Sequence, residues 1–156
     1  QEYQTMNLDE AKIYVLNLSR VLADKRKDYL LLAGKFAEGI LKSRVFGDGK
    51  ATQGSIGKYK DRKWAVKRFN AGRQIGYVDL NFTGSLMNSI QVGEDKNDVA
   101  VYINNDKKYD IARGQEQLQG RKVGKGKIEI WNLSDDEQEL VMQYIEELID
   151  EQIDKL

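Results

Sequence analysis

The spacing of hydrophobic positions changes along the chain, and each change marks a different predicted element. From about residue 8 to residue 43, apolar side chains recur at intervals of three, four and seven, which is typical of an amphipathic helix. Asn7 and Glu10 have the spacing of an N-cap and its capping-box partner. The charged run Asp24–Asp28 favours a kink or a break, so we expect one helix or a helix pair over 7–45.

Period-two alternation replaces this spacing in the middle of the chain. Residues 77–82 alternate between apolar and polar, and 90–92 and 99–103 flank the polar turn 93–98. Such runs predict a strand followed by a β-hairpin. Residues 128–131 predict one more strand.

The segments between these strands favour short helices. Thr83 can cap a single helical turn that carries Leu86 and Ile90 inward, and Gly84 allows a neighbouring backbone to come close. Residues 109–116 predict a short helical or irregular segment.

Helical spacing returns at the end of the chain. Ser134 and Glu137 form a capping-box pair, which predicts a helix from there to about residue 155. Its apolar face comprises Leu140, Val141, Tyr144, Ile145, Leu148, Ile149 and Ile153, and its other face is almost wholly acidic.

Together these elements predict an α+β fold in one domain, residues 1–156. We expect an N-terminal helix or helix pair over 7–45, a small antiparallel β-sheet within a β-rich core at 74–133, and a C-terminal helix at 134–156 packed on the sheet. Residues 46–73 are expected to form a long basic, glycine-rich loop.

The amino-acid composition excludes most kinds of catalytic site. The 156 residues include no Cys and no His, so thiolate nucleophiles, imidazole bases, disulfides and the usual zinc ligands are absent. The sequence also does not match the Walker A phosphate-binding motif. Tyr59 follows Gly57-Lys58 where Ser or Thr is required, and Thr52 stands where the first glycine is required. We therefore predict no enzyme activity, catalytic residue, cofactor or metal. A small hydrolase or nucleotide binder is the third alternative.

Charge is distributed unevenly along the chain. Residues 134–156 contain nine acidic residues and one basic residue, a local charge of −8, and because the whole chain is neutral the rest carries +8. A basic body and an acidic tail favour contacts between copies or with neighbouring proteins. No apolar run is long enough to span a membrane, so we expect a soluble protein with no membrane partner.

Two basic segments are candidate contact surfaces. The stretch 58–73 interleaves basic with aromatic residues, and the loop 120–127 is rich in glycine and lysine. Both compositions suit protein interfaces, and both also suit a nucleic-acid-binding module, which is the alternative interpretation. The candidate subunit or partner contacts are Lys60, Arg62, Lys63, Trp64, Lys67, Arg68, Arg121, Lys122 and Lys125.

The octapeptide at 83–90, TGSLMNSI, resembles the TG-x-L-x-x-S-I signature of neck and tail-completion proteins of tailed bacteriophages. The order of elements from about residue 33 to 156 is similar too, including the entry Trp131–Glu137 into the last helix. The chain differs in its insert 46–73 and in lacking a Pro-Ala-Arg-Pro-Phe run before that helix. The motif residues are Thr83, Gly84, Leu86, Ser89 and Ile90.

This resemblance implies a structural virion protein of the head–tail connector, made in the host cytoplasm and active in virus assembly. Such a subunit forms an oligomeric ring with copies of itself. The ring joins the portal or connector to the tail proteins and lets DNA pass through its lumen without sequence-specific binding.

Overall fold

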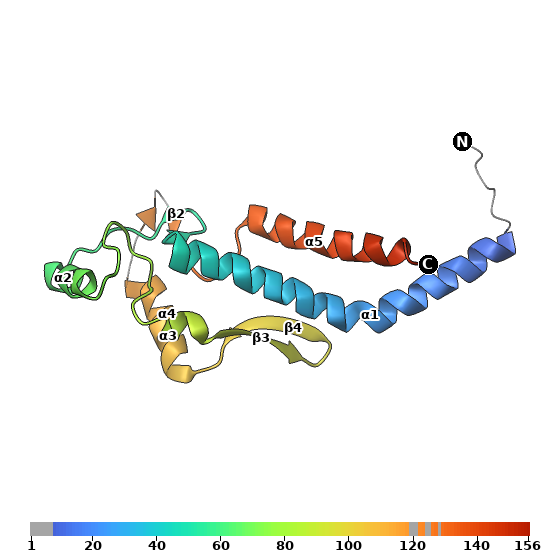
Figure 1. Ribbon diagram of the computed structural model, residues 1–156, viewed down its shortest axis with the longest axis horizontal. Coiled ribbons are helices and arrows are strands. Elements are labelled where there is room, and N and C mark those ends of the chain that lie inside the picture. The colour runs from blue at the N-terminus through green and yellow to red at the C-terminus, as the bar shows by residue number, and fades with distance from the viewer. Residues whose placement is uncertain (1–7, 119–121, 124–125, 128) are drawn as a thin grey trace.

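A long N-terminal helix organises the molecule. The computed structural model describes residues 8–118, 122–123, 126–127 and 129–156, and in it α1 (Leu8–Lys42) is a continuous helix of 35 residues followed by a π-helical turn, η1 (Ser43–Gly47). Of the two predicted alternatives, one helix or a helix pair, the single helix is confirmed, and its ribbon bends in the N-terminal part (Figure 1). Within the charged run, Lys25, Arg26 and Lys27 are good helix formers, and Lys25 pairs with Asp28 along the helix at 3.8 Å. The expected cap Asn7 lies outside the described residues.

In the described part of the chain, three antiparallel two-stranded sheets replace the single expected sheet. They are β1 (Lys50–Ala51) with β2 (Gly54–Ser55), β3 (Ile90–Asp95) with β4 (Asp98–Ile103), and β5 (Lys122–Val123) with β6 (Gly126–Lys127). In the longest, Ile90 pairs with Ile103 and Asp95 with Asp98, which confirms the hairpin predicted around the turn 93–98.

Two predicted strands are wrong. Residues 77–82 are irregular, with Leu80 at a φ of 52°, because the Asp79 carboxylate accepts the Asn81 N–H and bends the backbone. At 128–131, Ile128 lies outside the described residues, and 129–131 form no strand. There the backbone N–H groups of Ile130 and Trp131 donate to the Glu116 side chain and not to a strand.

The segment 46–73 is not a long loop, as had been expected. It contains the first small hairpin and a helix, α2 (Arg62–Asn70). Asp61 caps this helix by accepting the N–H groups of Lys63 (2.8 Å) and Trp64 (3.4 Å). The region 74–133 is likewise less β-rich than expected, since it carries the helices α3 (Ser85–Asn88) and α4 (Asp106–Leu118) as well as the central hairpin.

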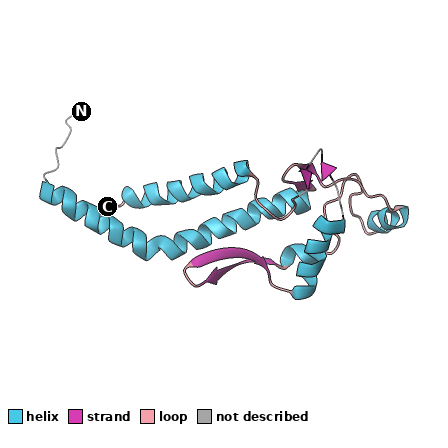
Figure 2. Cartoon of the chain, turned by 180° about the vertical axis from the view of Figure 1, so that it is seen from behind, coloured by secondary structure: helices cyan, strands magenta, loops and turns pink. Residues whose placement is uncertain are grey.

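The α+β class is confirmed, with α1 lying between the C-terminal helix and the main hairpin. Helix α5 (Asp135–Ile153) runs along one side of α1, and β3–β4 lies on the other (Figures 1 and 2). The predicted capping box at Ser134 and Glu137 is formed by both reciprocal hydrogen bonds.

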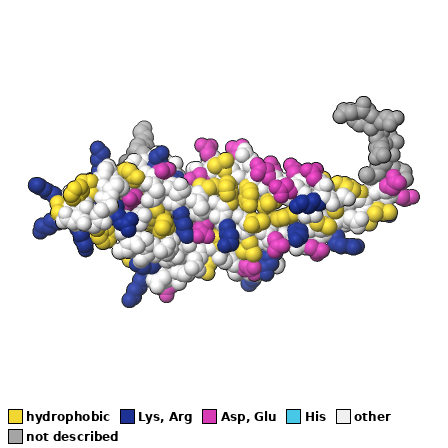
Figure 3. All heavy atoms as spheres, in the orientation of Figure 1, with side chains coloured by type: hydrophobic (Ala, Val, Ile, Leu, Met, Phe, Trp, Pro, Cys, Tyr) yellow, Lys and Arg dark blue, Asp and Glu magenta, His cyan; other side chains and the backbone are white. Residues whose placement is uncertain are grey.

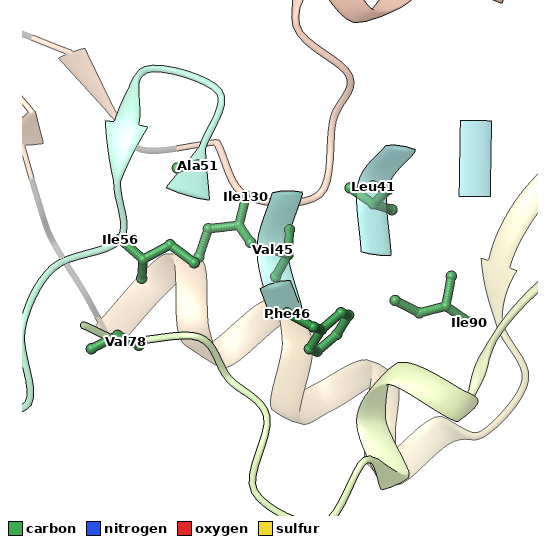
Figure 4. Close-up of a cluster of buried hydrophobic side chains, with 8 residues drawn as sticks. All are labelled: Leu41, Val45, Phe46, Ala51, Ile56, Val78, Ile90 and Ile130. Atoms are coloured by element: carbon green, nitrogen blue, oxygen red, sulfur yellow. The ribbon is translucent and has the colours of Figure 1, made fainter. Parts of the chain in front are cut away.

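The hydrophobic core sits where α1 ends. Its eight buried members come from distant parts of the sequence: Leu41, Val45, Phe46, Ala51, Ile56, Val78, Ile90 and Ile130 (Figure 4). The N-terminal part of α1 extends well beyond this cluster, with Ile13, Val15 and Leu16 exposed. None of the described helices is both long and apolar enough to cross a membrane.

Two glycines of α1 allow a matched test of how closely the hairpin packs. A Cβ added at Gly34 would lie 2.8 Å from the Val92 Cγ1 atom and 2.9 Å from the Val99 Cγ1 atom, whereas one at Gly39 would meet nothing within 4 Å. We expect Gly39→Ala to raise the free energy of unfolding by about 0.5–1 kcal/mol through helix propensity. Gly34→Ala should lower it by about 1–3 kcal/mol through overpacking.

Urea denaturation of both variants beside the unmodified chain measures this difference in sign. Equal stabilisation by the two substitutions would mean that the hairpin does not pack tightly on α1.

Candidate partner-binding groove

Helix α2 projects at one end of the molecule, beyond the end of α1 (Figure 1). Four of the predicted contact residues are exposed on or just before it, namely Lys60, Arg62, Lys63 and Lys67. In Figure 3, Lys and Arg side chains gather at this end, while Asp and Glu side chains gather over α5. The two charge signs of the sequence are therefore separated in space.

Arg68 was predicted to be a contact residue, and this prediction is wrong because Arg68 is buried. Its side chain is only 1% exposed and forms an ion pair of 2.9 Å with the Asp79 carboxylate. Its guanidinium also donates to the backbone carbonyls of Gln74 (3.2 Å) and Asn81 (3.1 Å) and lies over the Tyr59 ring, 4.6 Å from the centroid. Arg68 therefore holds α2 to the irregular segment that follows it and is not available to a partner.

Asp79 is the centre of this buried polar network. One carboxylate oxygen accepts from Arg68, from the Tyr59 hydroxyl (3.1 Å) and from the Asn81 N–H (3.0 Å), and the other accepts from the Gln74 amide (2.7 Å). Burial raises the pKa of Tyr59 above its usual 10.0, and the charge of Asp79 adds to this, against the lowering effect of Arg68.

The aromatic residues beside α2 are already in contact with each other. The rings of Trp64 and Phe82 are 5.0 Å apart, and the Lys67 ammonium lies 5.3 Å from the first centroid and 5.6 Å from the second. Trp64 is half-buried by this packing. The predicted contact residue thus contributes to the attachment of α2.

A groove of about 690 Å³ separates α2 from α3 and α4. Its apolar part includes Leu80, Leu86 and Ile111, and three lysines, Lys58, Lys60 and Lys108, also line it. No ion pair is formed by these three lysines within the part of the chain that the structure describes. Asp61 also lines the groove, so the groove offers apolar surface with an excess of positive charge, which suits a mixed apolar and acidic partner.

The motif residues divide between this groove and the core. Thr83, Gly84 and Leu86 line the groove, and the Thr83 hydroxyl accepts the Ser85 N–H at 3.3 Å. Gly84 has a φ of 79°, a conformation that favours glycine. Ser89 and Ile90 are buried, and the Ser89 hydroxyl donates to the Leu86 carbonyl at 2.6 Å.

The second predicted basic surface cannot be placed in the same way. Arg121 and Lys125 lie outside the described residues, and of Lys122 the structure describes the backbone, in β5. Across the described part of the chain, no group of three or more acidic side chains is arranged to hold a metal ion.

One structural residue was missed by sequence reasoning. The Arg44 guanidinium pairs with the Glu137 carboxylate at 2.7 Å and donates to the carbonyls of Lys50, Ile130 and Asn132. Its partners lie up to 93 positions away in the sequence, so no local pattern signals it.

Comparison of the chain with protein-family models, with curated proteins and with solved structures found no match.

The buried pair predicts that substitution of two arginines of the same helix has very different effects on the free energy of unfolding. Arg68→Met should lower the free energy of unfolding by about 3–5 kcal/mol, because it leaves the Asp79 charge buried without its cation. Arg62→Met, at an exposed position, should change it by less than about 0.5 kcal/mol. Urea denaturation measures both, and a stable Arg68→Met chain would show that the network does not hold α2.

The raised pKa of Tyr59 predicts a dependence of stability on alkaline pH. The unfolded chain loses this proton near pH 10, whereas the folded chain keeps it to higher pH, so this contribution is full below pH 10 and is lost as pH rises further. Tyr59→Phe removes it. The stability difference between the two chains should therefore be constant from about pH 7 to about pH 9 and shrink towards about pH 11. A difference that stays constant in urea denaturation across this range would contradict the assignment.

Proposed function

We propose that this chain is a structural virion protein of a tailed bacteriophage, a ring-forming neck or tail-completion subunit that joins the portal or connector to the tail around the DNA channel. The resemblance of residues 83–90 to the neck-protein signature supplies the protein class. The shape and surface of the subunit support a role in assembly.

The observation that carries the proposal is the excess of accessible surface. The chain exposes 11399 Å², whereas a compact monomer of 17.9 kDa exposes about 8,000 Å². An extended subunit of this kind leaves much of its surface to be covered by neighbours, as is usual in proteins that fold as parts of an assembly.

Part of this exposed surface is strongly apolar. At the α2 end, Phe69 is 66% exposed, and Val66 and Ile75 are exposed beside it. At the other end of the molecule, Ile13 and Leu16 are exposed on α1. Large apolar side chains gathered at both ends mark interaction sites, and contact surfaces at both ends suit a subunit placed between two neighbouring structures.

The alternative function is a nucleic-acid-binding module. The exposed basic residues around α2 favour it, because they would neutralise phosphates. Against it, two of the aromatic residues at this end, Trp64 and Phe82, already contact each other and the Lys67 ammonium, and base stacking needs free aromatic faces.

Electron microscopy and native mass spectrometry of the purified chain test the proposal. Over a series of rising protein concentrations we expect closed rings of one copy number, with a lumen wide enough for duplex DNA. The same samples are tested for retention of a duplex DNA oligonucleotide at low and high salt. A monomer at every concentration that retains DNA with a steep salt dependence would replace the proposal with the alternative.

A further inference from the structure

We propose that the groove between α2 and α3–α4 is the seat for the acidic outer face of α5 from a second copy, with Met142 of that copy inserted among Leu80, Leu86 and Ile111. This interface rests on the proposed function, since it requires that the chain assembles with itself. It names the surfaces through which one subunit would contact the next.

The outer face of α5 is complementary to the groove, because it combines an apolar side chain with negative charge. Met142 is 55% exposed, although it is a large apolar side chain on a helix whose outward surface is acidic. Glu139 and Glu146 lie three residues before it and four residues after it, so both neighbour Met142 on the helix surface, and both are exposed. An apolar side chain flanked by two carboxylates matches an apolar groove lined by lysines.

The same chain does not fill its own groove. The inner face of its α5 lies on α1, where the rings of Phe36 and Tyr144 are 4.8 Å apart and the Tyr29 hydroxyl donates to Gln152 at 3.4 Å. The groove lies beyond the C-terminal end of α1, beside α2, and none of the described residues of α5 lines it (Figure 1). The groove and the outer face of α5 are thus separate surfaces of one molecule. A contact between them is therefore head-to-tail and repeats from copy to copy. It closes into a ring if the rotation between copies permits.

A protein surface fits this groove better than nucleic acid does. Its lysines are interspersed with aliphatic side chains, and its aromatic lining residues, Tyr59, Trp64 and Phe82, already contact Arg68 or each other. A groove for single strands instead combines basic residues with free aromatic faces. The rings of Trp64 and Phe82 lie 5.0 Å apart at an interplanar angle of 51°, and the Lys67 ammonium lies over both.

Cross-linking tests the contact directly, because the chain has no native cysteine. Ser85→Cys places one thiol in the groove and Met142→Cys places one on α5. The two variants, mixed and treated with a short bismaleimide, should give a covalent heterodimer at least about tenfold more often than Ser19→Cys mixed with Met142→Cys. Ser19 is exposed on α1, far from α2, and serves as the matched control. Equal yields from the two mixtures would overturn the proposal.

Charge exchange provides a second test that does not depend on one introduced thiol. The groove variant Lys58→Glu with Lys60→Glu and the helix variant Glu139→Lys with Glu146→Lys should each weaken self-association at least about tenfold, because like charges then face each other. Mixing the two variants should restore association, since each altered surface then finds an opposite charge.

The outcomes separate this interface from the proposed function. If the unmodified chain forms rings and neither variant affects them, the interface is wrong and the proposed function stands. If the unmodified chain does not associate, the proposed function fails first. If the groove variant loses retention of a duplex DNA oligonucleotide while association is unchanged, the groove binds nucleic acid and the proposed interface is wrong. Circular dichroism checks that both variants remain folded.

Discussion

The structure depends on a junction at the end of α1, where one arginine joins the first hairpin to segments up to 93 positions away in the sequence. The Arg44 guanidinium pairs with Glu137 and donates to the backbone carbonyls of Lys50, Ile130 and Asn132. Glu137 also completes the capping box of α5, so the same carboxylate starts the last helix and attaches it to the first. These backbone hydrogen bonds and the nearly buried ion pair fix the positions of the segments around the core.

The hydrophobic core lies at this junction, so most of α1 extends beyond it. On each side, that part of α1 is covered by at most one layer of secondary structure. On one side it has the single helix α5 and on the other the two strands of β3–β4. Neither layer reaches its N-terminal part, and α2 projects beyond the other end, attached by the buried pair of Arg68 and Asp79. The result is an elongated chain with apolar and charged surface at both ends, which is the physical basis for proposing a role in an assembly.

The sequence predicts the features that local chemistry decides. The capping box at Ser134 and the hairpin at 90–103 follow from spacing over a few residues, and both are confirmed. The alternation at 77–82 is misleading because Asp79, at a position read as facing solvent, turns inward to Arg68, and this contact bends the chain. The contact partners of Arg68 lie close to it in the sequence. However, no sequence pattern distinguishes a buried arginine from the exposed basic residues of the same stretch.

The octapeptide at 83–90 links the interior to the groove. Its last two residues are buried, with Ile90 in the core, while Thr83, Gly84 and Leu86 line the groove. The left-handed turn at Gly84 sets the direction in which the chain enters α3 and therefore the position of the apolar side chains beyond it. A sequence that changed this turn would move the groove and the core together. The short segment that anchors the hairpin thus also forms one wall of the groove, the surface for which we propose a role in assembly.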